Sequence, residues 1–335
     1  ITDKDKTIDF IFECKPDVVI NSAAYTDVDG CETNQDLAYA VNGDGVRNLA
    51  LACKQIDCPL VHVSTDYVFD GTAREPIAED GEIGPISIYG KSKLKGEEAI
   101  QEILDKYFIV RTAWLYGING KNFPKTMLEL AEKHPEITVV YDEVGTPTYT
   151  PDLAYGISQL IETDYYGIYH LTNSGSCSWC EFARYIFEIA GRDVKVIPVT
   201  ASEFSRPAPR PSYSVLKNEK WVENGFEPLR DYKEAIKEYI DSKDYRQEQM
   251  DKLLVYFLFR YFMNSYYDSN AVSYAYLAIM FTLMVRDMNA VRFYKNGGHF
   301  SVDDQIDVAR IFSKEVEHSE ENVELAREEI IFSGN

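Results

Sequence analysis

The chain has 335 residues, a formal net charge of −21 and 45% hydrophobic residues. That hydrophobic fraction is enough to form cores, which excludes a chain that is disordered throughout. The strong acidity argues against nucleic acid as a partner, because phosphate binding requires clustered Lys and Arg. No signal peptide opens the sequence, and six scattered cysteines do not suggest a disulfide framework. We therefore expect a reducing, cytoplasmic location.

The first part of the chain alternates short β-branched runs with amphipathic helical segments. Residues 16–24 (PDVVINSAA), 59–69 (PLVHVSTDYVF) and 107–117 (YFIVRTAWLYG) are predicted strands, and 48–56 and 91–104 are predicted helices. This alternation is typical of parallel βαβ units whose sheet is covered by helices on both faces. It predicts a doubly wound α/β sheet that binds ligands outside the carboxyl ends of its strands.

The pattern changes after about Gly145, where turn-rich sequence leads into a smaller α/β segment. Ser178 and Glu181 form a capping-box pattern that opens an apolar-periodic helix, and the Pro-rich residues 205–216 are predicted to be an extended loop. From residue 242 the composition becomes polar and then helical and aromatic. The predicted domains are an incomplete Rossmann-like domain (1–144), a substrate-binding lobe (145–241) and an all-α domain (242–335).

Two features have competing interpretations. The uncharged run at residues 269–285 is barely long enough to span a membrane, and polar residues within it favour a buried core helix, so we expect no membrane span. Cys177 and Cys180 have CxxC spacing, but no second pair accompanies them for zinc. The capping box explains this stretch better than a redox or metal role does.

Hydroxyl and carboxyl groups follow the second predicted strand, where Ser64, Thr65 and Asp66 stand at its carboxyl end. Tyr89 and Lys93 lie one turn apart at the start of the next predicted helix. A tyrosine hydroxyl normally titrates near 10, and a nearby ammonium favours the phenolate and brings its pKa toward neutral pH. This combination is suited to proton transfer at a carbonyl oxygen.

Five motifs extend this pattern: INSAAYTDVD, VNGDGVRNLA, STDYVFDG, YGKSKLKGE and RTAWLYG. In their order and spacing, residues 1–241 resemble the extended short-chain dehydrogenases, and among these the dTDP-4-dehydrorhamnose reductase family. The resemblance implies NADPH or NADH as cofactor and a nucleotide-sugar substrate. It also implies reduction of the C4 ketone of a dTDP-4-keto-6-deoxyhexose, the last step of dTDP-L-rhamnose synthesis.

The resemblance assigns roles to individual positions. The catalytic residues are Thr65, which would orient the carbonyl, Tyr89, which would protonate the new alkoxide, and Lys93, which would bind the ribose and tune Tyr89. The positions along the cofactor are Ala23, Ala24, Tyr25, Asn42, Ser64, Tyr89 and Lys93. The positions at the sugar nucleotide are Thr65, Asp66, Arg111, Trp114, Asn122, Phe123 and Arg206.

One position separates this family from sister activities. Sugar-nucleotide dehydratases carry Asp-Glu after the strand-end threonine, whereas Asp66 is followed here by Tyr67. The missing glutamate favours simple ketone reduction. Structural alternatives remain open for single residues: Lys93 as a solvated helix lysine, Trp114 as a core residue and Arg111 as an ion-pair partner. His62 and His170 are predicted to be core histidines.

The Gly-x-x-Gly-x-x-Gly turn that cradles the pyrophosphate in this family is absent from the sequence. We therefore expect weak cofactor binding, and a non-catalytic binding or regulatory subunit of the same fold is the alternative. The last ninety residues, and above all SKEVEHSEENVELA, resemble the C-terminal helical part of flagellin lysine-N-methylase. That part is expected to form an oligomer or bind a protein, or to be a helical bundle only, and we transfer neither methylation nor a metal site. A third interpretation of the protein, which rests on this tail alone, is a scaffold related to flagellin modification.

Overall fold

The computed structural model describes residues 1–204 and 206–241. The chain divides into two compact units, Ile1–Ile240 and Asp241–Asn335. The predictions for the helical domain at 242–335, including the apolar run at 269–285, lie outside the described residues. Among the residues that are described, no helix is long and apolar enough to cross a membrane.

A four-stranded parallel sheet lies at the centre of the first unit. Its strands are β1 (Val19–Asn21), β2 (Leu60–Thr65), β3 (Tyr107–Thr112) and β8 (Gly167–His170), in the order β1-β2-β3-β8. All three pairings are parallel. The predicted doubly wound sheet is thus confirmed. Because β8 belongs to it, the range 145–241 supplies part of this sheet as well as the lobe.

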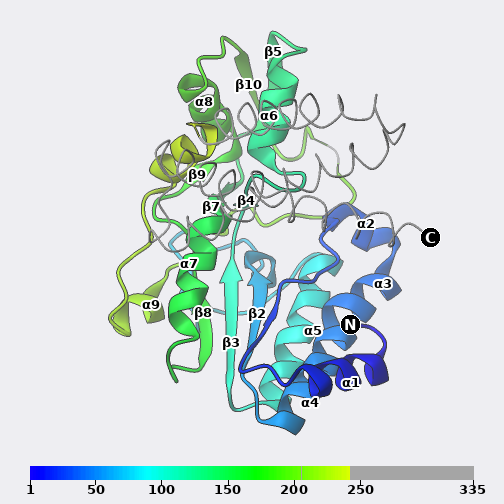
Figure 1. The fold of residues 1–335 in the computed structure, drawn as a ribbon. Coiled ribbons are helices and arrows are strands. Elements are labelled where there is room, and N and C mark those ends of the chain that lie inside the picture. The colour runs from blue at the N-terminus through cyan, green and yellow to red at the C-terminus, as the bar shows by residue number, and fades with distance from the viewer. Residues whose placement is uncertain (205, 242–335) are drawn as a thin grey trace, which may run out of the picture. The chain divides into compact units, whose positions relative to one another are not determined.

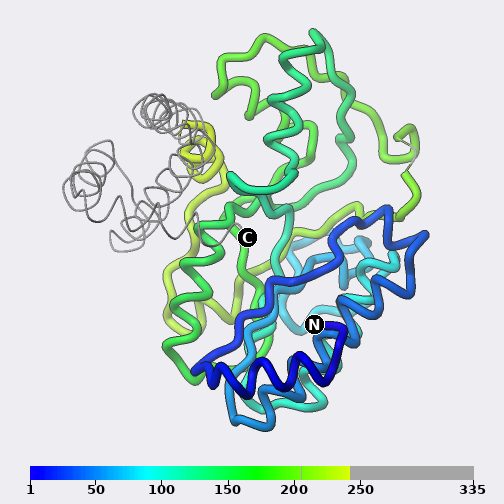
Figure 2. Tube along the Cα trace, turned by 45° about the vertical axis from the view of Figure 1, so that its right-hand side comes forward, coloured from blue at the N-terminus to red at the C-terminus, as the bar shows by residue number. Residues whose placement is uncertain are grey.

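Helices cover both faces of the sheet, as the buried hydrophobic runs require. On one side lie α1 (Lys4–Cys14), α4 (Gly45–Ile56) and α5 (Ile88–Ile103), and on the other α7 (Thr150–Leu160) and α9 (Glu219–Glu223) (Figure 1). Figures 1 and 2 both show α1 beside α4. Neighbouring strand residues face opposite cores, since Leu60 packs with α1, α4 and α5 whereas Val61 packs with α7.

Short helical elements connect β1 to α4. They are α2 (Val28–Thr33), α3 (Gln35–Tyr39) and a π-helical turn over Ala40–Asp44. Single π-turns within helices are frequent at functional sites. Here the turn contains Asn42, which is fully buried.

The lobe lies beyond the carboxyl ends of the main strands, toward which the arrow of β3 points in Figure 1. The lobe's elements are β4 (Leu115–Tyr116), α6 (Phe123–Ala131), β5 (Glu136–Val140), β6 (Val144–Gly145), β7 (Thr148–Tyr149), β9 (Cys177–Ser178), α8 (Trp179–Ile189), β10 (Lys195–Val199) and a helix at residues 232–241. Three two-stranded sheets pair β10 with β5, β4 with β7, and β6 with β9. An aromatic core that includes Tyr116, Phe182 and Tyr239 holds these elements together.

The predicted strand at 107–117 is interrupted in the structure. It is divided into β3 and β4, because Trp114 has φ +45, outside the extended region. Helix α8 begins as predicted: the Ser178 hydroxyl accepts from the Glu181 N–H at 3.2 Å, and the Glu181 carboxylate accepts from the Ser178 N–H at 2.8 Å. Cys177 and Cys180 are buried free thiols beside this cap.

Removing the Ser178 hydroxyl tests the contribution of this cap to stability. We expect Ser178→Ala to lower the free energy of unfolding by about 1 kcal/mol, because an N-terminal N–H of α8 loses its acceptor. Ser158→Ala in α7 is the matched control, since that hydroxyl only donates to the Tyr155 carbonyl. Urea titration of both variants measures the difference, and equal losses would contradict a special role of the cap.

Candidate active site

The carboxyl end of β2 presents two polar side chains that bond to each other. The Thr65 hydroxyl accepts from the Tyr67 N–H at 3.2 Å and donates to Oδ1 of Asp66 at 3.0 Å. Thr65 thereby caps the 3₁₀ turn Asp66–Val68, which fixes its rotamer. Thr65 and Asp66 are both buried. Burial raises the pKa of Asp66 to about 6, although hydrogen bonds from Ser214 and Thr65 oppose the rise.

Tyr89 reaches this strand end from the first turn of α5. Ser87 caps the helix by accepting from the Gly90 N–H at 3.1 Å. A Cβ at Gly90 would lie 2.2 Å from the Tyr67 carbonyl oxygen, so glycine lets the helix start against the strand end. The Tyr89 ring meets the Tyr67 ring edge to face at 5.4 Å. The structure therefore brings Thr65, Asp66 and Tyr89 together.

The pKa of Tyr89 is raised from its ordinary value, mainly by burial, and Asp66 adds to the rise. A hydrogen bond with Thr65 acts in the opposite direction. Lys93, which is predicted to tune the pKa of Tyr89, is not among the groups that shift it in the structure. Lys93 is only 2% exposed, and its side-chain nitrogen Nζ donates to the Val63 carbonyl at 2.7 Å and lies 3.2 Å from Nε2 of His62.

The segment after β1 is held by Asn42. Its side-chain oxygen accepts from the Tyr25 N–H at 2.8 Å, and its amide donates to the Tyr25 carbonyl at 3.1 Å. The same amide donates to the Ser92 hydroxyl of α5 at 3.0 Å. Asn42 thus ties the strand-end segment to the helix that carries Tyr89, while Ala23 is left exposed and Ala24 half-buried.

A buried polar network fixes the middle of α5 to β2 and β3. Glu97 accepts from the Ser64 hydroxyl at 2.5 Å and from Nη2 of Arg111 at 2.7 Å. The side chains of Arg111 and Glu97 are 3% and 0% exposed. Another guanidinium nitrogen of Arg111 donates to the Glu79 carbonyl at 3.1 Å. These contacts favour the ion-pair interpretation of Arg111, and the Ser64 hydroxyl donates its proton to Glu97.

The aromatic candidates of the lobe gather around Trp179. The Trp114 ring stacks on it with ring centroids 3.4 Å apart, and Phe123 lies 4.5 Å from it. Trp114 is half-buried and its positive φ is strained for a large residue, which is a common feature of binding sites. Asn122 caps α6 by accepting from the Lys125 N–H at 3.0 Å and also donates to the Gly117 carbonyl.

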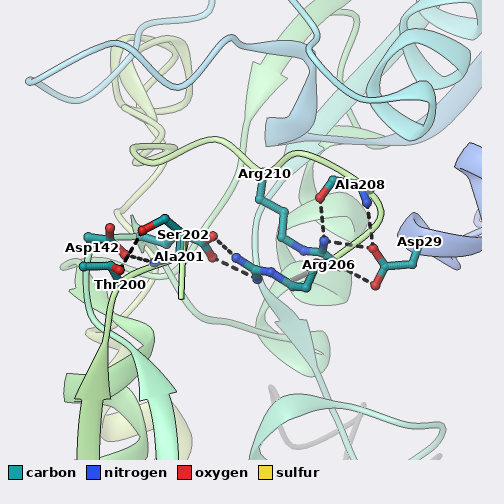
Figure 3. Close-up of polar contacts among 9 residues, drawn as sticks. Asp29, Asp142, Thr200, Ala201, Ser202, Arg206, Ala208 and Arg210 are labelled. Carbon is teal, nitrogen blue, oxygen red and sulfur yellow. Dashed lines mark hydrogen bonds and ion pairs between the residues drawn. The ribbon is translucent and has the colours of Figure 1, made fainter. Parts of the chain in front are cut away.

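The Pro-rich loop carries two arginines that face acidic partners (Figure 3). Arg206 pairs with Glu143, and Arg210 forms a bidentate pair with Asp29 at 2.9 and 2.8 Å. The charges of Arg210 and Glu143 both act on the pKa of Tyr67, so they lie near the strand end. The family resemblance pointed to Arg206 and not to Arg210, although both lie in the Pro-rich residues 206–211 (RPAPRP).

A parallel doubly wound sheet with threonine, tyrosine and lysine at the carboxyl end of one βα unit defines the class of extended short-chain dehydrogenases. Residues 1–245 match the RmlD substrate binding domain family, and the chain belongs to it. Residues 213–334 match the FliB lysine N-methylase C-terminal domain, in agreement with the resemblance of the tail.

Individual relatives agree with this family. A spore coat polysaccharide biosynthesis protein of Bacillus subtilis is 46% identical over 68% of this chain and 80% of the relative. A dTDP-4-dehydrorhamnose reductase of Streptomyces griseus is 44% identical over 71% of this chain and 81% of that protein. Crystal structures named dTDP-4-dehydrorhamnose reductase, from Clostridium acetobutylicum and, with NADP, from Bacillus anthracis, are 51% and 44% identical. Both crystal structures have a TM-score of 0.71 and cover 72% of this chain. This chain covers 85% of the Clostridium acetobutylicum structure and 86% of the Bacillus anthracis structure.

Breaking the buried pair between Glu97 and Arg111 should destabilise the fold strongly. We expect Glu97→Gln to lower the free energy of unfolding by about 3 kcal/mol, because the buried guanidinium loses its counter-charge. Glu102→Gln is the matched control on the same helix, where the pair with Arg47 is largely exposed, and it should change stability little. Denaturant unfolding compares the two, and a Glu97→Gln variant as stable as Glu102→Gln would exclude the proposed anchoring.

The raised pKa of Asp66 predicts a pH-dependent effect on stability. The folded state holds this proton up to about pH 6, whereas the unfolded value is near 3.8, so stability is lost as pH rises between these values. Asp66→Asn removes this loss. Its stability relative to the original chain should therefore improve by about 2 kcal/mol between pH 4.5 and pH 8.

Asp70→Asn controls for this measurement, because the pKa of Asp70 is lowered by hydrogen bonds with Thr72. Its folded and unfolded pKa values both lie below this pH range, so its relative stability should stay nearly constant between pH 4.5 and pH 8. Chemical unfolding at both pH values distinguishes the two variants. A pH-independent effect of Asp66→Asn would show that the carboxyl is ionised throughout.

Proposed function

We propose that this chain reduces the C4 ketone of a dTDP-4-keto-6-deoxyhexose with NADPH or NADH, the reaction of a dTDP-4-dehydrorhamnose reductase. The observation that carries the proposal is the hydrogen-bonded arrangement of Thr65, Asp66 and Tyr89 at the carboxyl end of β2. It places two hydroxyls side by side at the edge of the sheet where ligands bind, and the Thr65 hydroxyl would turn its proton from Asp66 to the ketone oxygen. Family membership and 44% identity to a reductase support the same reaction.

The chain's own residues perform orientation and proton transfer. A reduced nicotinamide cofactor supplies the hydride when it is bound. Thr65, with its rotamer fixed by the Tyr67 N–H, orients the ketone, and Tyr89 donates the proton to the oxygen as it becomes an alkoxide. The raised pKa of Tyr89 keeps this hydroxyl protonated before reaction.

Several residues suit a nicotinamide cofactor. Ala23 and Ala24 follow β1 with small side chains that leave the backbone accessible, and Asn42 holds the adjacent Tyr25 in place. In this role Asn42 positions residues 23–25, which we call the cofactor segment. Lys93 would hold the ribose, and to do so its side chain must turn away from the Val63 carbonyl.

The sugar nucleotide would lie between the strand end and the lobe. Trp114 is the half-buried aromatic surface available to it, and Phe123 and Asn122 fix the start of α6 beneath Trp179. The arginines of the loop, Arg206 and Arg210, would meet the diphosphate, for which planar guanidinium groups are well suited. We place this reaction in the cytoplasm, where the six free cysteines would remain reduced.

A second candidate is a non-catalytic nucleotide-binding or regulatory subunit of the same fold. The observation that favours it is the position of Lys93, which contacts His62 and Val63 rather than Tyr89 in the described contacts. Tight binding of NADPH, followed by fluorescence, without oxidation in the presence of the dTDP-4-keto sugar would support this candidate over the reductase.

Replacing the tyrosine hydroxyl tests the proton donor. We expect Tyr89→Phe to reduce kcat for NADPH oxidation with the dTDP-4-keto sugar by about 10²-fold or more, the usual contribution of a positioned acid. Tyr165→Phe, at an exposed tyrosine, should leave the rate unchanged. Initial rates followed at 340 nm provide the measurement, and unaltered turnover in Tyr89→Phe would assign the proton to another group.

A further inference from the structure

A chain of three buried side chains runs from β1 through β2 to α5. The amide nitrogen of Asn21 lies 2.9 Å from Nδ1 of His62, and Nε2 of His62 lies 3.2 Å from Nζ of Lys93. The residues are 5%, 0% and 2% exposed. Lys93 also donates to the Val63 carbonyl at 2.7 Å. This chain connects the end of β1, where the cofactor segment starts, to the lysine one turn after Tyr89.

Hydrogen-bond directions along this chain follow from one backbone contact. The Ala23 N–H lies 3.1 Å from Oδ1 of Asn21, and an N–H can only donate, so this atom must be the amide oxygen. The other side-chain atom of Asn21 is then the NH₂ group, which donates to Nδ1 of His62. A neutral imidazole that accepts at Nδ1 carries its proton on Nε2, the nitrogen that faces Lys93.

An ammonium group at Lys93 does not fit this arrangement, because it has no lone pair for the Nε2–H. A neutral amine does fit, since it accepts from Nε2–H and donates to the Val63 carbonyl. We infer that His62 is a positioning residue that holds Lys93 as a neutral amine against the Val63 carbonyl. Lys93 would then take up a proton when it leaves His62 to act beside Tyr89, a consequence that rests on the proposed function.

The charged surroundings agree with this assignment. Burial lowers the pKa of Lys93 to about 8, and Glu97 on α5 is the charge that opposes the shift. Glu97 is already bound by Arg111 and Ser64 and does not pair with Lys93 in the described contacts. On β2, His62 is itself neutral, since burial lowers its pKa well below the ordinary value. Asn21 on β1 contributes no charge.

The tautomer of His62 tests the inference without cofactor or turnover. The full chain contains five histidines, so ¹⁵N-histidine labelling gives a small set of ring signals, with His62→Gln identifying those of His62. We expect His62 to carry its proton on Nε2 at pH 9, where Lys93 is an amine. In ¹⁵N-lysine-labelled chain, with Lys93→Met for assignment, Lys93 should change from ammonium to amine near pH 8. A proton on Nδ1, or a Lys93 ammonium that persists above pH 10, would overturn the inference.

A near-isosteric substitution at Asn21 should reverse the direction of the hydrogen bonds from Asn21 through His62 to Lys93. In Asn21→Asp the carboxylate can accept from both the Ala23 N–H and Nδ1–H, so His62 should move its proton to Nδ1 and present a lone pair to Lys93. The ammonium should then persist to higher pH by at least one unit. Asn34→Asp is the control, because Asn34 is exposed and is not hydrogen-bonded to Asn21, His62 or Lys93 in the described contacts. It should leave the tautomer of His62 unchanged. A His62 proton that stays on Nε2 in Asn21→Asp would contradict the assignment.

These measurements separate the inference from the proposed function. An inactive chain with an Nε2–H tautomer and a Lys93 that titrates near pH 8 would retain the role of His62 and reject only the reductase. An active protein in which His62 carries its proton on Nδ1 would retain the reductase and reject the role of His62. The original chain alone decides between the two tautomers, so failure of Asn21→Asp to fold does not affect the main test.

Discussion

The requirement that buried polar groups have hydrogen-bond partners determines how α5 lies on the sheet. Glu97 and Lys93 both face the strands with almost no exposure, and each needs polar partners there. Ser64 and Arg111 satisfy Glu97, and the Val63 carbonyl and His62 satisfy Lys93. A shift of the helix would leave one of these buried polar groups without a partner, so the register of α5 against β2 is fixed, and with it the position of Tyr89 beside Thr65.

Asn42, in the π-helical turn, provides a second constraint on the position of α5. The side-chain amide of Asn42 hydrogen-bonds to both the Tyr25 backbone and the Ser92 hydroxyl, so the segment after β1 and the start of α5 cannot shift independently. The binding edge is therefore built from side chains that already satisfy one another. Such preorganisation favours orientation of a ligand, because little ordering remains to occur on binding.

Backbone patterns in the sequence predicted much of the fold. The β-branched runs at β2 and β3 and the capping box at Ser178 could be read directly, because they reflect local propensity and burial. Side-chain partners could not be read in the same way. The spacing of Tyr89 and Lys93 places both on one helix face, yet the rotamer of Lys93 depends on His62 and Val63, which lie about thirty residues earlier. The interruption of the strand at Trp114 likewise depends on tertiary stacking with Trp179.

The pair between Asp29 and Arg210 joins residues 181 apart in sequence. Contacts of such long separation require most of the intervening chain to be ordered first, since loop closure costs entropy before the contact forms. We therefore expect this pair to form late in folding, after the sheet and α5 are in place. Interactions that form after the transition state act mainly on the rate of unfolding, so the pair should affect how long the folded site persists rather than how fast it appears.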